Sequence, residues 1–501
     1  MASDQNKKPA KCIAVFGTGS DVGKSIIATA LCRYFFKKGY KTAPFKAQNM
    51  SNNSGITPEG LEMGRAQIVQ AEAAGVVPHV DMNPVLLKPT SDVGSQVVLH
   101  GKVHENNTAA EYHQKKELLF KAVTDSLDRL REENDIVVIE GAGSCAEVNL
   151  MPHDIVNFRV AEYADAPVLI VADIHRGGVF GQLVGTMACL PQEYRDLTAG
   201  FIINRFRGDI SLFKDGADWI EDKTEKPVLG TLPWFEHITI EAEDSVVIEK
   251  PVNVFPVTNR NQLICVIRLP HISNFTDFDP LSALDGVELV FLEKTCDLSQ
   301  FKAVIIPGSK NTIHDLNWLH KTGWAETIQH YAKRNGHITG ICGGYQILGA
   351  YLHDPEGCEG VPGSAAGLDL LPVETTMKDV KTTTLSCFHW GGIDGTGYEI
   401  HMGQTERTGG ERLFDVTARN QEAVTLEDGC ISDNFNVIGT YMHGLFDKKG
   451  ILEKWLDYIG LSDVVVPEVQ GLAARDKEYD LLTDHFENYI DTDAIHALLT
   501  K

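Results

Sequence analysis

The chain has 501 residues, a length that suggests two or three domains with sizeable hydrophobic cores. Its 45 Lys and Arg residues against 69 Asp and Glu residues give a formal net charge of −24, which argues against general binding to nucleic acid or anionic membranes, because phosphate-rich partners would be repelled. The ten cysteines include no C-x-x-C pair and no apolar run reaches the about 18 residues of a membrane span, so we expect a cytoplasmic protein with reduced thiols.

A glycine-rich loop follows the first predicted strand, Lys11 to Phe16, and runs into a helical pattern of apolar residues. Strand, loop and helix in this order are typical of a phosphate-binding P-loop, whose backbone N–H groups surround phosphate oxygens. Lys24 is predicted to reach the terminal phosphates of ATP, and Ser25 to ligate Mg²⁺. The loop is one residue longer than the standard pattern and resembles the loop of dethiobiotin synthetase and its amidase relatives. The predicted ATP-binding residues of the loop are Gly17, Thr18, Gly19, Ser20, Asp21, Val22, Gly23, Lys24 and Ser25.

Polar residues follow later predicted strands at their carboxyl ends, where open α/β sheets bind ligands. Lys46 follows the strand from Thr42 to Phe45 and could contact ATP phosphates, a substrate carboxylate or only solvent. Glu140 ends the strand within Asp135 to Ser144, at the position of a Walker B carboxylate that holds Mg²⁺. Asn204 follows a further strand and is another candidate for ATP binding.

Four more residues are candidates for substrate contacts, with ordinary surface-loop chemistry as the alternative. Gln48 and Asn49 follow Lys46, Lys88 precedes a predicted turn, and Arg176 lies in the glycine-rich loop DIHRGGVFG. Each lies near a predicted strand of a nucleotide-binding unit, so a role in holding an anionic substrate is compatible with its charge or polarity.

The chain alternates strands and helices in two blocks. Strands predicted at Val168–Ala172, Gly200–Ile203 and Val228–Leu232 imply a parallel, doubly wound sheet in the first block. The pattern weakens in an acidic, proline-containing stretch and then resumes at Ile264. We therefore expect a flexible N-terminus at 1–10, an ATP-binding domain at 11–233, a linker at 234–262 and a second domain at 263–501 with a C-terminal helical tail.

The second domain is organised around Cys342, in the stretch HITGICGGYQILG from His337 to Gly349. A short apolar strand ends at Ile341 and a helix follows, so Cys342 lies at a strand-to-helix elbow that only its flanking glycines allow. The elbow presents the thiol outward, and the helix dipole favours the thiolate. A buried structural cysteine is the alternative. The flanking glycines favour a nucleophile.

The elbow resembles the G-x-C-x-G motif of class I glutamine amidotransferase domains, which implies a flavodoxin-like second domain with a cysteine nucleophile and a histidine base. His443 follows the predicted strand at Val437 and Ile438, in the chain order that the resemblance implies. Leu445 stands where many class I domains carry glutamate, so the group that orients His443 is unassigned. The predicted oxyanion donors are the backbone N–H groups of Gly308, Ser309 and Gly343.

Longer segments extend the resemblance over nearly the whole chain: APFKAQNM, GRAQ, DMNPVLLKPTSD, ISNFTDFDP and PGSKNT. With the P-loop and the elbow, they resemble the cobyric acid synthase family. Cys145 stands where that family often has proline, and His271 where it often has arginine. The resemblance implies ATP- and glutamine-dependent amidation of the b, d, e and g carboxylates of adenosylcobyrinic acid a,c-diamide in cobalamin biosynthesis. It implies Mg²⁺ as cofactor and corrinoid, glutamine and ATP as small-molecule substrates.

Two other functions stay open at this point. One is a corrinoid a,c-diamide synthase of the same architecture, against which the family-specific segments argue. The other is a nucleotide-controlled P-loop binding protein with an inactive amidotransferase-like domain, against which the pairing of Cys342 with His443 argues. The sequence specifies neither the oligomeric state nor the order of the amidations.

Overall fold

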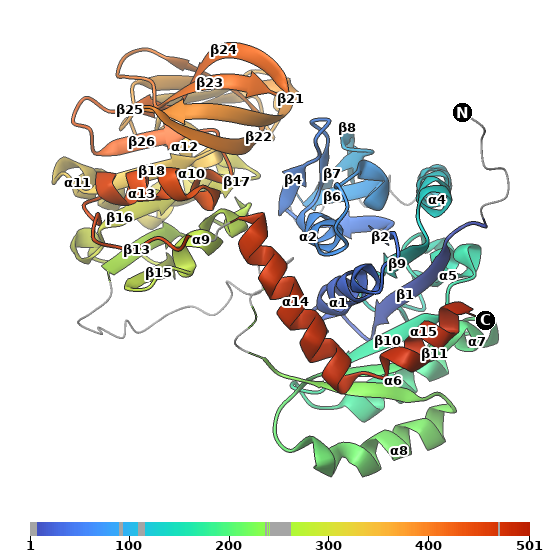
Figure 1. The fold of residues 1–501 in the computed structure, drawn as a ribbon. Helices are drawn as coiled ribbons and strands as arrows, with labels where there is room; N and C mark the ends of the chain where they lie inside the picture. The colour runs from blue at the N-terminus through green and yellow to red at the C-terminus, as the bar shows by residue number, and fades with distance from the viewer. Residues whose placement is uncertain are drawn as a thin grey trace.

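The computed structural model describes residues 8–89, 94–108, 116–235, 238, 240, 262–468 and 471–500. They form two α/β domains, shown in Figure 1 with the first in blue to green and the second in yellow to orange. The expected pair of doubly wound sheets is confirmed. No helix among these residues is long and apolar enough to cross a membrane.

The first domain is built on a six-stranded parallel sheet in the order β12-β11-β10-β1-β9-β2. Its central strands are apolar except at their ends, as expected for a sheet that is covered by helices on both faces. β1 lies between β9 and β10, and Val15 pairs with Glu140, so the P-loop begins beside that carboxylate. The strands are β1 (Lys11–Gly17), β2 (Thr42–Phe45), β9 (Ile136–Glu140), β10 (Val168–Asp173), β11 (Thr198–Phe206) and β12 (Val228–Pro233).

The helices of the first domain follow the predicted alternation. The longest of them, α4, buries Leu119, Val123 and Leu127 at helical spacing against the core. The segment rich in helix formers, Glu59–Gly75, is helical only in its second half, because β5 occupies part of the first half. The helices are α1 (Lys24–Lys37), α2 (Arg65–Ala73), α4 (Lys116–Glu133), α5 (Phe158–Ala164), α6 (Val179–Cys189), α7 (Gln192–Leu197) and α8 (Lys214–Thr224).

Short strands extend from the first domain toward the second (Figure 1). A four-stranded sheet has the order β3-β6-β7-β8, and β4 pairs with β5 as a separate antiparallel hairpin. β4 contacts β21 and β22 of the second domain. The strands are β3 (Gln48–Met50), β4 (Ser54–Ile56), β5 (Glu62–Gly64), β6 (Val85–Pro89), β7 (Gly94–Leu99) and β8 (Lys102–Thr108).

The second domain has a six-stranded sheet in the order β15-β13-β16-β18-β26-β25, parallel except for the edge strand β25. β18 lies between β16 and β26, which brings the residues after these three strands together. The strands are β13 (Gln262–Ile267), β15 (Val287–Leu292), β16 (Ala303–Ile306), β18 (His337–Ile341), β25 (Cys430–Ile431) and β26 (Val437–Thr440). The helices are α9 (Asp279–Ser282), α10 (Thr312–Thr322), α11 (Trp324–Lys333), α12 (Gly343–Leu348) and α13 (Lys449–Tyr458).

An additional sheet, which the sequence did not predict, is inserted between α12 and β26. Its long hairpin β21–β22 packs over the carboxyl end of the parallel sheet, and β14 and β17 form a small two-stranded ladder nearby. The ladder consists of β14 (Ile272–Ser273) and β17 (Gly308–Ser309). The strands of the inserted sheet are β19 (Tyr351–Asp354), β20 (Gly363–Ala366), β21 (Val373–Trp390), β22 (Ile393–Arg407), β23 (Phe414–Arg419) and β24 (Glu422–Asp428).

The C-terminal helices α14 (Leu472–Tyr489) and α15 (Thr492–Thr500) return to the first domain, whereas the sequence predicts them as a tail of the second domain (Figure 1). Buried Tyr479 and Phe486 join the core on the α1 side of the first sheet. Arg33 on α1 also pairs with Asp476 and Asp480. The amphipathic helices thus cover a sheet face that α1 leaves open.

The expected N-terminus and linker fall largely outside the described residues, at 1–7 and within 236–261. Ala10 is buried, and its N–H donates to the Arg131 carbonyl at 2.8 Å.

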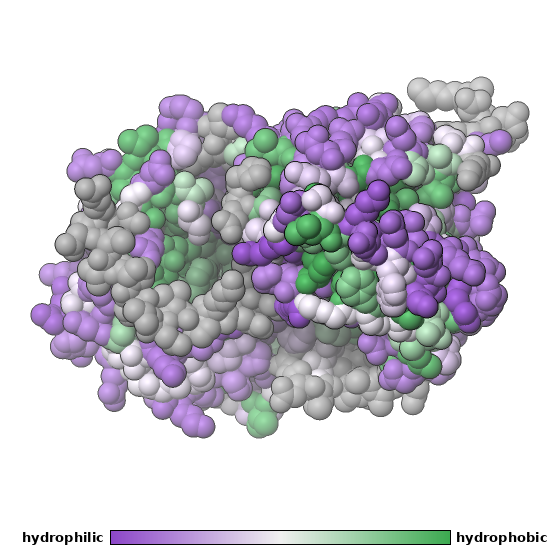
Figure 2. Space-filling model, turned by 90° about the horizontal axis from the view of Figure 1, so that it is seen from below, coloured by the Kyte–Doolittle hydropathy of each residue, from purple (hydrophilic) through white to green (hydrophobic). Residues whose placement is uncertain are grey.

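Seen from below in Figure 2, the surface consists mainly of hydrophilic residues with smaller hydrophobic areas. This agrees with the excess of acidic residues in the sequence.

Candidate active sites

Cys342 lies at the predicted elbow between β18 and α12, with φ of +53° and ψ of −107°. A non-glycine residue in this conformation costs about 1–3 kcal/mol, and such strain is common at nucleophiles. A Cβ atom on Gly344 would lie 1.9 Å from the Ile306 carbonyl oxygen, so the following turn requires glycine. The thiol is not presented outward as predicted. It is 6 % exposed, because β22 covers it and the Ile400 carbonyl accepts a hydrogen bond from Sγ at 3.4 Å.

His443 is also buried and lies beside the thiol, and Asp277 is the orienting group that the sequence left unassigned. Asp277 Oδ2 lies 2.6 Å from His443 Nδ1, and Asp277 Oδ1 accepts from the Gly444 N–H at 2.9 Å. Burial lowers the pKa of His443, but the charges of Asp277 and Cys342 and their hydrogen bonds outweigh burial and raise it to about 10. The ring therefore carries a proton at neutral pH and can pair with a Cys342 thiolate.

The predicted oxyanion donors meet next to this pair. A Cβ atom on Gly343 would lie 2.8 Å from the Ser309 nitrogen, so these two backbone groups are adjacent. One built on Gly308 would lie 3.2 Å from His443 Cε1, so this glycine also borders the site. The turn is fixed by buried Asp315, which accepts from Ser309 Oγ at 2.7 Å and lies 2.8 Å from His271 Nδ1. His271 thus contacts the same carboxylate that holds Ser309.

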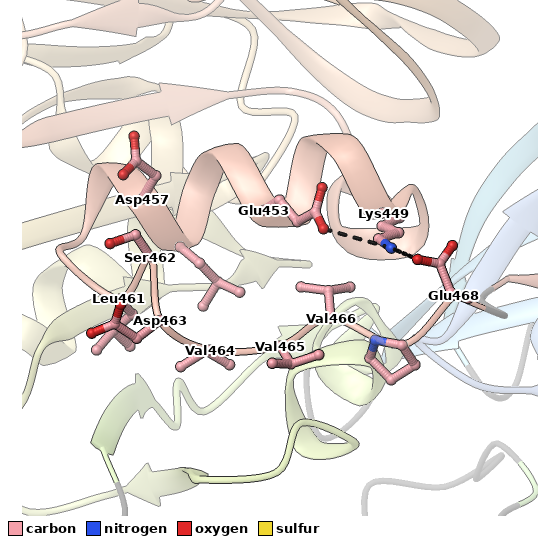
Figure 3. A pocket seen from close by; sticks show the side chains of 12 residues that line it. Lys449, Glu453, Asp457, Leu461, Ser462, Asp463, Val464, Val465, Val466 and Glu468 are labelled. Carbon is pink, nitrogen blue, oxygen red and sulfur yellow. Dashed lines mark hydrogen bonds and ion pairs between the residues drawn. The ribbon is translucent and has the colours of Figure 1, made fainter.

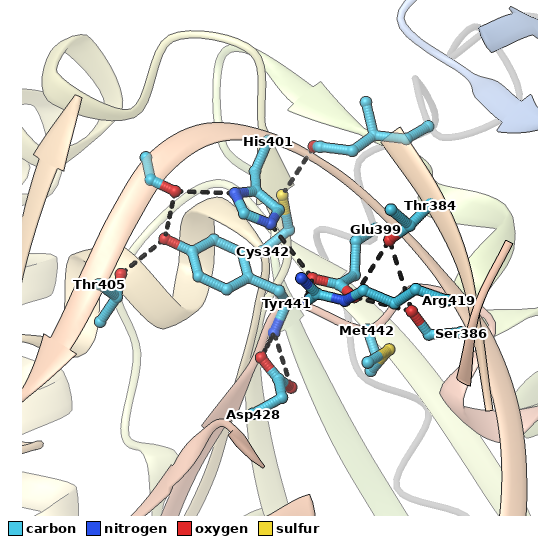
Figure 4. Close-up of polar contacts among 12 residues, drawn as sticks. Cys342, Thr384, Ser386, Glu399, His401, Thr405, Arg419, Asp428, Tyr441 and Met442 are labelled. Carbon is cyan, nitrogen blue, oxygen red and sulfur yellow. Dashed lines mark hydrogen bonds and ion pairs between the residues drawn. The ribbon is translucent and has the colours of Figure 1, made fainter. Parts of the chain in front are cut away.

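The hairpin β21–β22 supplies a polar wall around the thiol (Figure 4). His401 Nδ1 lies 2.8 Å from the Gly403 carbonyl oxygen, and its ring stacks on Tyr441 at 3.6 Å. Glu399, almost fully buried, accepts from Arg419 at 2.8 Å. The sequence did not identify Glu399 and Arg419, because β22 and β23, which carry them, belong to the unpredicted sheet. Tyr441 directly follows β26 of the parallel sheet and was not identified either.

The P-loop of the first domain brings Lys24, Ser25 and Glu140 together. Gly23 ends the loop at a φ of +98°, directly before α1. Lys24 Nζ donates to the carbonyls of Gly19 at 2.8 Å and Gly143 at 3.0 Å, and Ser25 Oγ donates to Glu140 Oε1 at 2.8 Å. The loop therefore presents a lysine and a hydroxyl–carboxylate pair at the start of one helix.

Glu140 is completely buried and is compensated by three donors. Besides Ser25, Lys46 Nζ lies 2.9 Å away and Gln70 Nε2 lies 2.5 Å away. Lys46 is 4 % exposed, so it is not a solvated loop cation. A hydroxyl and a carboxylate are the hard oxygen ligands that Mg²⁺ prefers. The ammonium group of Lys46 lies against this carboxylate, so the position suits a cation. The residues present therefore fit a magnesium ion.

Asn204 and Arg176 lie on the other side of the P-loop. Asn204 Nδ2 donates to the Val22 carbonyl at 2.9 Å, and Arg176 Nη2 donates to Asp21 Oδ2 at 2.9 Å. Arg205, which directly follows Asn204 in the sequence, bridges Asp21 at 2.8 Å and Asp173 at 3.0 Å. These contacts hold the loop from the β10 and β11 edge.

The other predicted substrate residues contact different parts of the first domain. Asn49 Nδ2 donates to Gln67 on α2 at 3.0 Å, and Gln48 lies one residue before it on β3. Lys88 is 3 % exposed and pairs with Glu62. The structure thus brings Asn49 and Lys88 into contact with buried partners, whereas Arg176 contacts the P-loop.

A cavity of about 470 Å³ lies away from both sites, between α13 and the segment after it (Figure 3). Lys449 at its rim pairs with Glu453 and Glu468. Neither Cys342 nor His443 lines it. The size of this cavity therefore does not make it part of either candidate active site.

Comparison with known proteins assigns the two domains separately. Residues 13–247 match the CobQ/CobB/MinD/ParA nucleotide binding domain, and residues 263–451 match the CobB/CobQ-like glutamine amidotransferase domain. A cobyric acid synthase of Chlorobium phaeobacteroides (strain BS1) is 50% identical over 98% of this chain and 99% of its own length. A cobyric acid synthase of Chlorobaculum tepidum is 50% identical over 97% of each chain, and one of Syntrophobacter fumaroxidans is 44% identical over 98% of this chain and 99% of its own.

Proposed function

The chain belongs to the cobyric acid synthase family of glutamine-hydrolysing ligases, and on this premise we propose that it amidates the b, d, e and g carboxylates of adenosylcobyrinic acid a,c-diamide. ATP activates each carboxylate and glutamine supplies the nitrogen. The product is adenosylcobyric acid, an intermediate of cobalamin biosynthesis. The likeness to proteins of that name over nearly the full chain supports this substrate.

The first domain would carry out the activation. A substrate carboxylate oxygen attacks the γ-phosphorus of ATP, ADP leaves, and an acyl phosphate results. Lys24 stabilises the charge on the transferred phosphoryl group, and the backbone N–H groups of the P-loop hold the other phosphates. Ser25 and Glu140 would hold Mg²⁺, which supplies neutralisation of the phosphate charge. Lys46 lies on the same carboxylate and is placed to neutralise charge on a phosphate or an acceptor carboxylate.

The second domain would release ammonia from glutamine. The Cys342 thiolate attacks the amide carbon, the N–H groups of Ser309 and Gly343 stabilise the oxyanion, and a glutamyl thioester forms as ammonia leaves. His443, whose pKa of about 10 keeps it protonated, gives its proton to the leaving nitrogen. It then takes a proton from the water that hydrolyses the thioester to glutamate. Asp277 holds the ring in place throughout.

The two reactions complete each other in one chain. Ammonia attacks the acyl carbon, phosphate leaves and the nitrogen loses a proton, which produces the amide. The observation that carries this proposal is the buried Cys342–His443–Asp277 constellation in the same chain as a P-loop whose Ser25 contacts Glu140. A binding protein that used only nucleotide would not need a strained, covered thiol beside a protonated histidine.

The decisive experiment is mass spectrometry of corrinoid products after incubation with the a,c-diamide, ATP, Mg²⁺ and glutamine. Four successive replacements of a hydroxyl group by an amino group are expected. An enzyme that leaves the a,c-diamide unchanged but converts cobyrinic acid into it would be the a,c-diamide synthase. Absence of both glutamate release and any amidation, in folded protein, would indicate the binding protein.

A further inference from the structure

Two histidines and an aspartate converge in the second domain and take no part in the chemistry described above. His271 directly precedes β14, and His314 and Asp315 lie in the first turn of α10. The side chain of Asp315 is 0 % exposed, that of His271 21 % and that of His314 57 %. A ring nitrogen of each histidine and a carboxylate oxygen of the aspartate all lie within 4.8 Å of one another. We call these three residues the histidine–aspartate cluster.

The distances within the histidine–aspartate cluster suit the ligands of one metal ion. His271 Nδ1 lies 2.8 Å from Asp315 Oδ1, and His314 Nδ1 lies 3.5 Å from the same oxygen. Ligand atoms bound to one tetrahedral zinc ion at about 2.0–2.1 Å lie roughly 3.3–3.4 Å apart. The two observed distances fall on either side of this spacing, so small rotations of the rings would complete the geometry.

The two oxygens of Asp315 have different partners. Oδ2 accepts from Ser309 Oγ at 2.7 Å and from the His271 N–H at 3.1 Å, whereas Oδ1 faces the two imidazole rings. Carboxylates that bind metal ions are themselves held by hydrogen bonds, which fix their orientation. The bonds to Oδ2 therefore orient the carboxylate so that Oδ1 can serve as the ligand. A metal ion would replace the proton in the contact between His271 Nδ1 and Oδ1.

Backbone hydrogen bonds fix all three residues of the cluster in place. The His271 carbonyl accepts from the Lys310 N–H at 2.9 Å. The His314 N–H donates to Asn311 Oδ1 at 3.2 Å, which caps the start of α10, and the Asp315 N–H donates to the Asn311 carbonyl at 3.0 Å. Only side-chain rotations are then needed for an ion to bind, which keeps the cost of ordering the site low.

The types of the three ligands indicate which ions the cluster would bind. Two imidazole nitrogens and one carboxylate oxygen suit Zn²⁺ and similar divalent transition-metal ions, whereas Mg²⁺ prefers oxygen ligands. Ser25 and Glu140 in the first domain offer only oxygens, so the two sites should select different ions. Because the side chain of His314 is more than half exposed, water can reach the ion and supply a fourth ligand.

We propose that the histidine–aspartate cluster binds a zinc ion or a similar divalent transition-metal ion through His271 Nδ1, His314 Nδ1 and Asp315 Oδ1. The ion joins the chain before β14 to the start of α10. Ser309, which lies between these segments in the sequence, is held by the other oxygen of the same carboxylate. The bound ion therefore stabilises the turn that carries Ser309. Binding needs only the three side chains, so it does not depend on the proposed function.

The first test is a calorimetric titration of the full chain, without an affinity tag, with Zn²⁺ in the presence of excess Mg²⁺. Every protein in the series carries Cys342→Ala, so that the thiol of the active site cannot bind zinc. We expect the background protein to bind one zinc ion at the cluster, and His314→Ala to bind it at least about 10-fold more weakly. His320→Ala removes another exposed histidine of α10 and is the matched control, with the affinity of the background protein.

The second test identifies the ligand atoms and the effect on the turn. Co²⁺ bound by nitrogen and oxygen should show visible absorption without the near-ultraviolet band of a cobalt–thiolate bond, and both His314→Ala and His271→Gln should lose this absorption. His271→Gln lies outside α10 and decides the matter if His314→Ala does not fold. Hydrogen exchange of the backbone amides in residues 308–316 should be several-fold slower with Zn²⁺ in the background protein, and unchanged by Zn²⁺ in His314→Ala.

Three results would overturn this inference. Equal zinc affinity in the background protein and both histidine variants would show that the cluster is only a hydrogen-bonded network. A cobalt spectrum with a thiolate band that survives both substitutions would place the ion at a cysteine instead. Zinc binding at the cluster without slower exchange in residues 308–316 would refute the stabilisation of the turn. None of these results bears on the amidation reaction, which is measured separately.

Discussion

The residue on which the glutaminase chemistry depends most sharply is Asp277, and Asp277→Asn is the change that isolates its charge. The variant keeps the side-chain shape but replaces the carboxylate that faces His443 Nδ1 at 2.6 Å. The pKa of His443 is raised from 6.5 to about 10 against the effect of burial, and Asp277 and Cys342 are the causes. At about 1.4 kcal/mol per pKa unit, this net rise of about 3.5 corresponds to about 5 kcal/mol, shared between the two groups.

Without the carboxylate, burial favours the neutral ring, so the pKa of His443 should fall and its proton be lost near neutral pH. A neutral ring in the wrong tautomer neither stabilises the thiolate nor protonates the leaving nitrogen. We expect kcat for glutamate release to fall on the order of 10³–10⁴-fold with little change in KM, as when the aspartate of a catalytic triad is replaced.

The assay is glutamate release over a range of pH, with ammonium-driven synthesis measured in parallel and expected at the parental rate. Asp285→Asn, an exposed aspartate of the same domain, is the control for loss of a carboxylate. If Asp277→Asn released glutamate at a rate within a few-fold of the parental rate, the role assigned to this residue would be refuted.

The same pair has a signature in stability. Because the pKa of His443 is higher in the folded protein than in the unfolded chain, its contribution is complete below pH about 6.5 and is lost as the pH rises through about 10. The free energy of unfolding of the parent should therefore fall more steeply in alkaline solution than that of Asp277→Asn. Parallel curves in denaturant titrations at several pH values would contradict this.

Four further changes test the two halves of the molecule. Cys342→Ala should abolish glutamine-driven synthesis and spare synthesis from ammonium at high pH, because the ATP site lies in the other domain; loss of both in folded protein would contradict the division into two sites. Lys24→Ala should abolish synthesis from either donor, and undiminished product with ammonium would exclude a role at the phosphates. Glu140→Gln should raise the Mg²⁺ concentration needed for half-maximal synthesis, and an unchanged titration would exclude metal binding. Phe486→Ala should lower the free energy of unfolding by about 3–5 kcal/mol, measured with denaturant against Leu481→Ala, an exposed position on the same helix; equal effects would show that α14 does not stabilise the first domain.

The parts of both sites that the sequence predicts are those formed by consecutive residues. A P-loop and a nucleophile elbow each depend on a backbone path that a few glycines permit, so the pattern and the conformation occupy the same short stretch. Gly23 at φ +98° and Gly344 against the Ile306 carbonyl are instances of this. Glu140 was predictable for a related reason, since a strand end in a parallel sheet lies beside its neighbour's loop.

Asp277 was not predictable in this way, because it comes from a segment far from His443 in the sequence. The only local signal was negative, the leucine at position 445, which showed that the orienting group must come from elsewhere. Its segment was noticed within ISNFTDFDP, but the motif alone does not say which side chain faces the ring. The inserted sheet was missed for a similar reason, because a local pattern does not show which surface its strands cover.

The return of the C-terminal helices was missed because an amphipathic pattern identifies a buried face without identifying its partner. Tyr479 and Phe486 are buried in the core on the α1 side of the first sheet. Arg33 of α1 also pairs with Asp476 and Asp480 of α14. Packing of this kind depends on tertiary contacts that have no counterpart in short sequence windows.

The interface also joins the first domain to the glutaminase constellation through the backbone. The Ser54 N–H on β4 donates to Asn274 Oδ1 at 3.1 Å, and Ser54 Oγ donates to Glu62, which pairs with Lys381 of the second domain. Asn274, at a φ of +52°, directly precedes the 3-10 helix Phe275–Phe278 that holds Asp277. A shift of β4 on substrate binding would therefore reach the segment that orients His443 through one hydrogen bond and three residues of chain. The same strand therefore contacts both the segment that orients His443 and, through Glu62, the ion pair to Lys381 of the second domain.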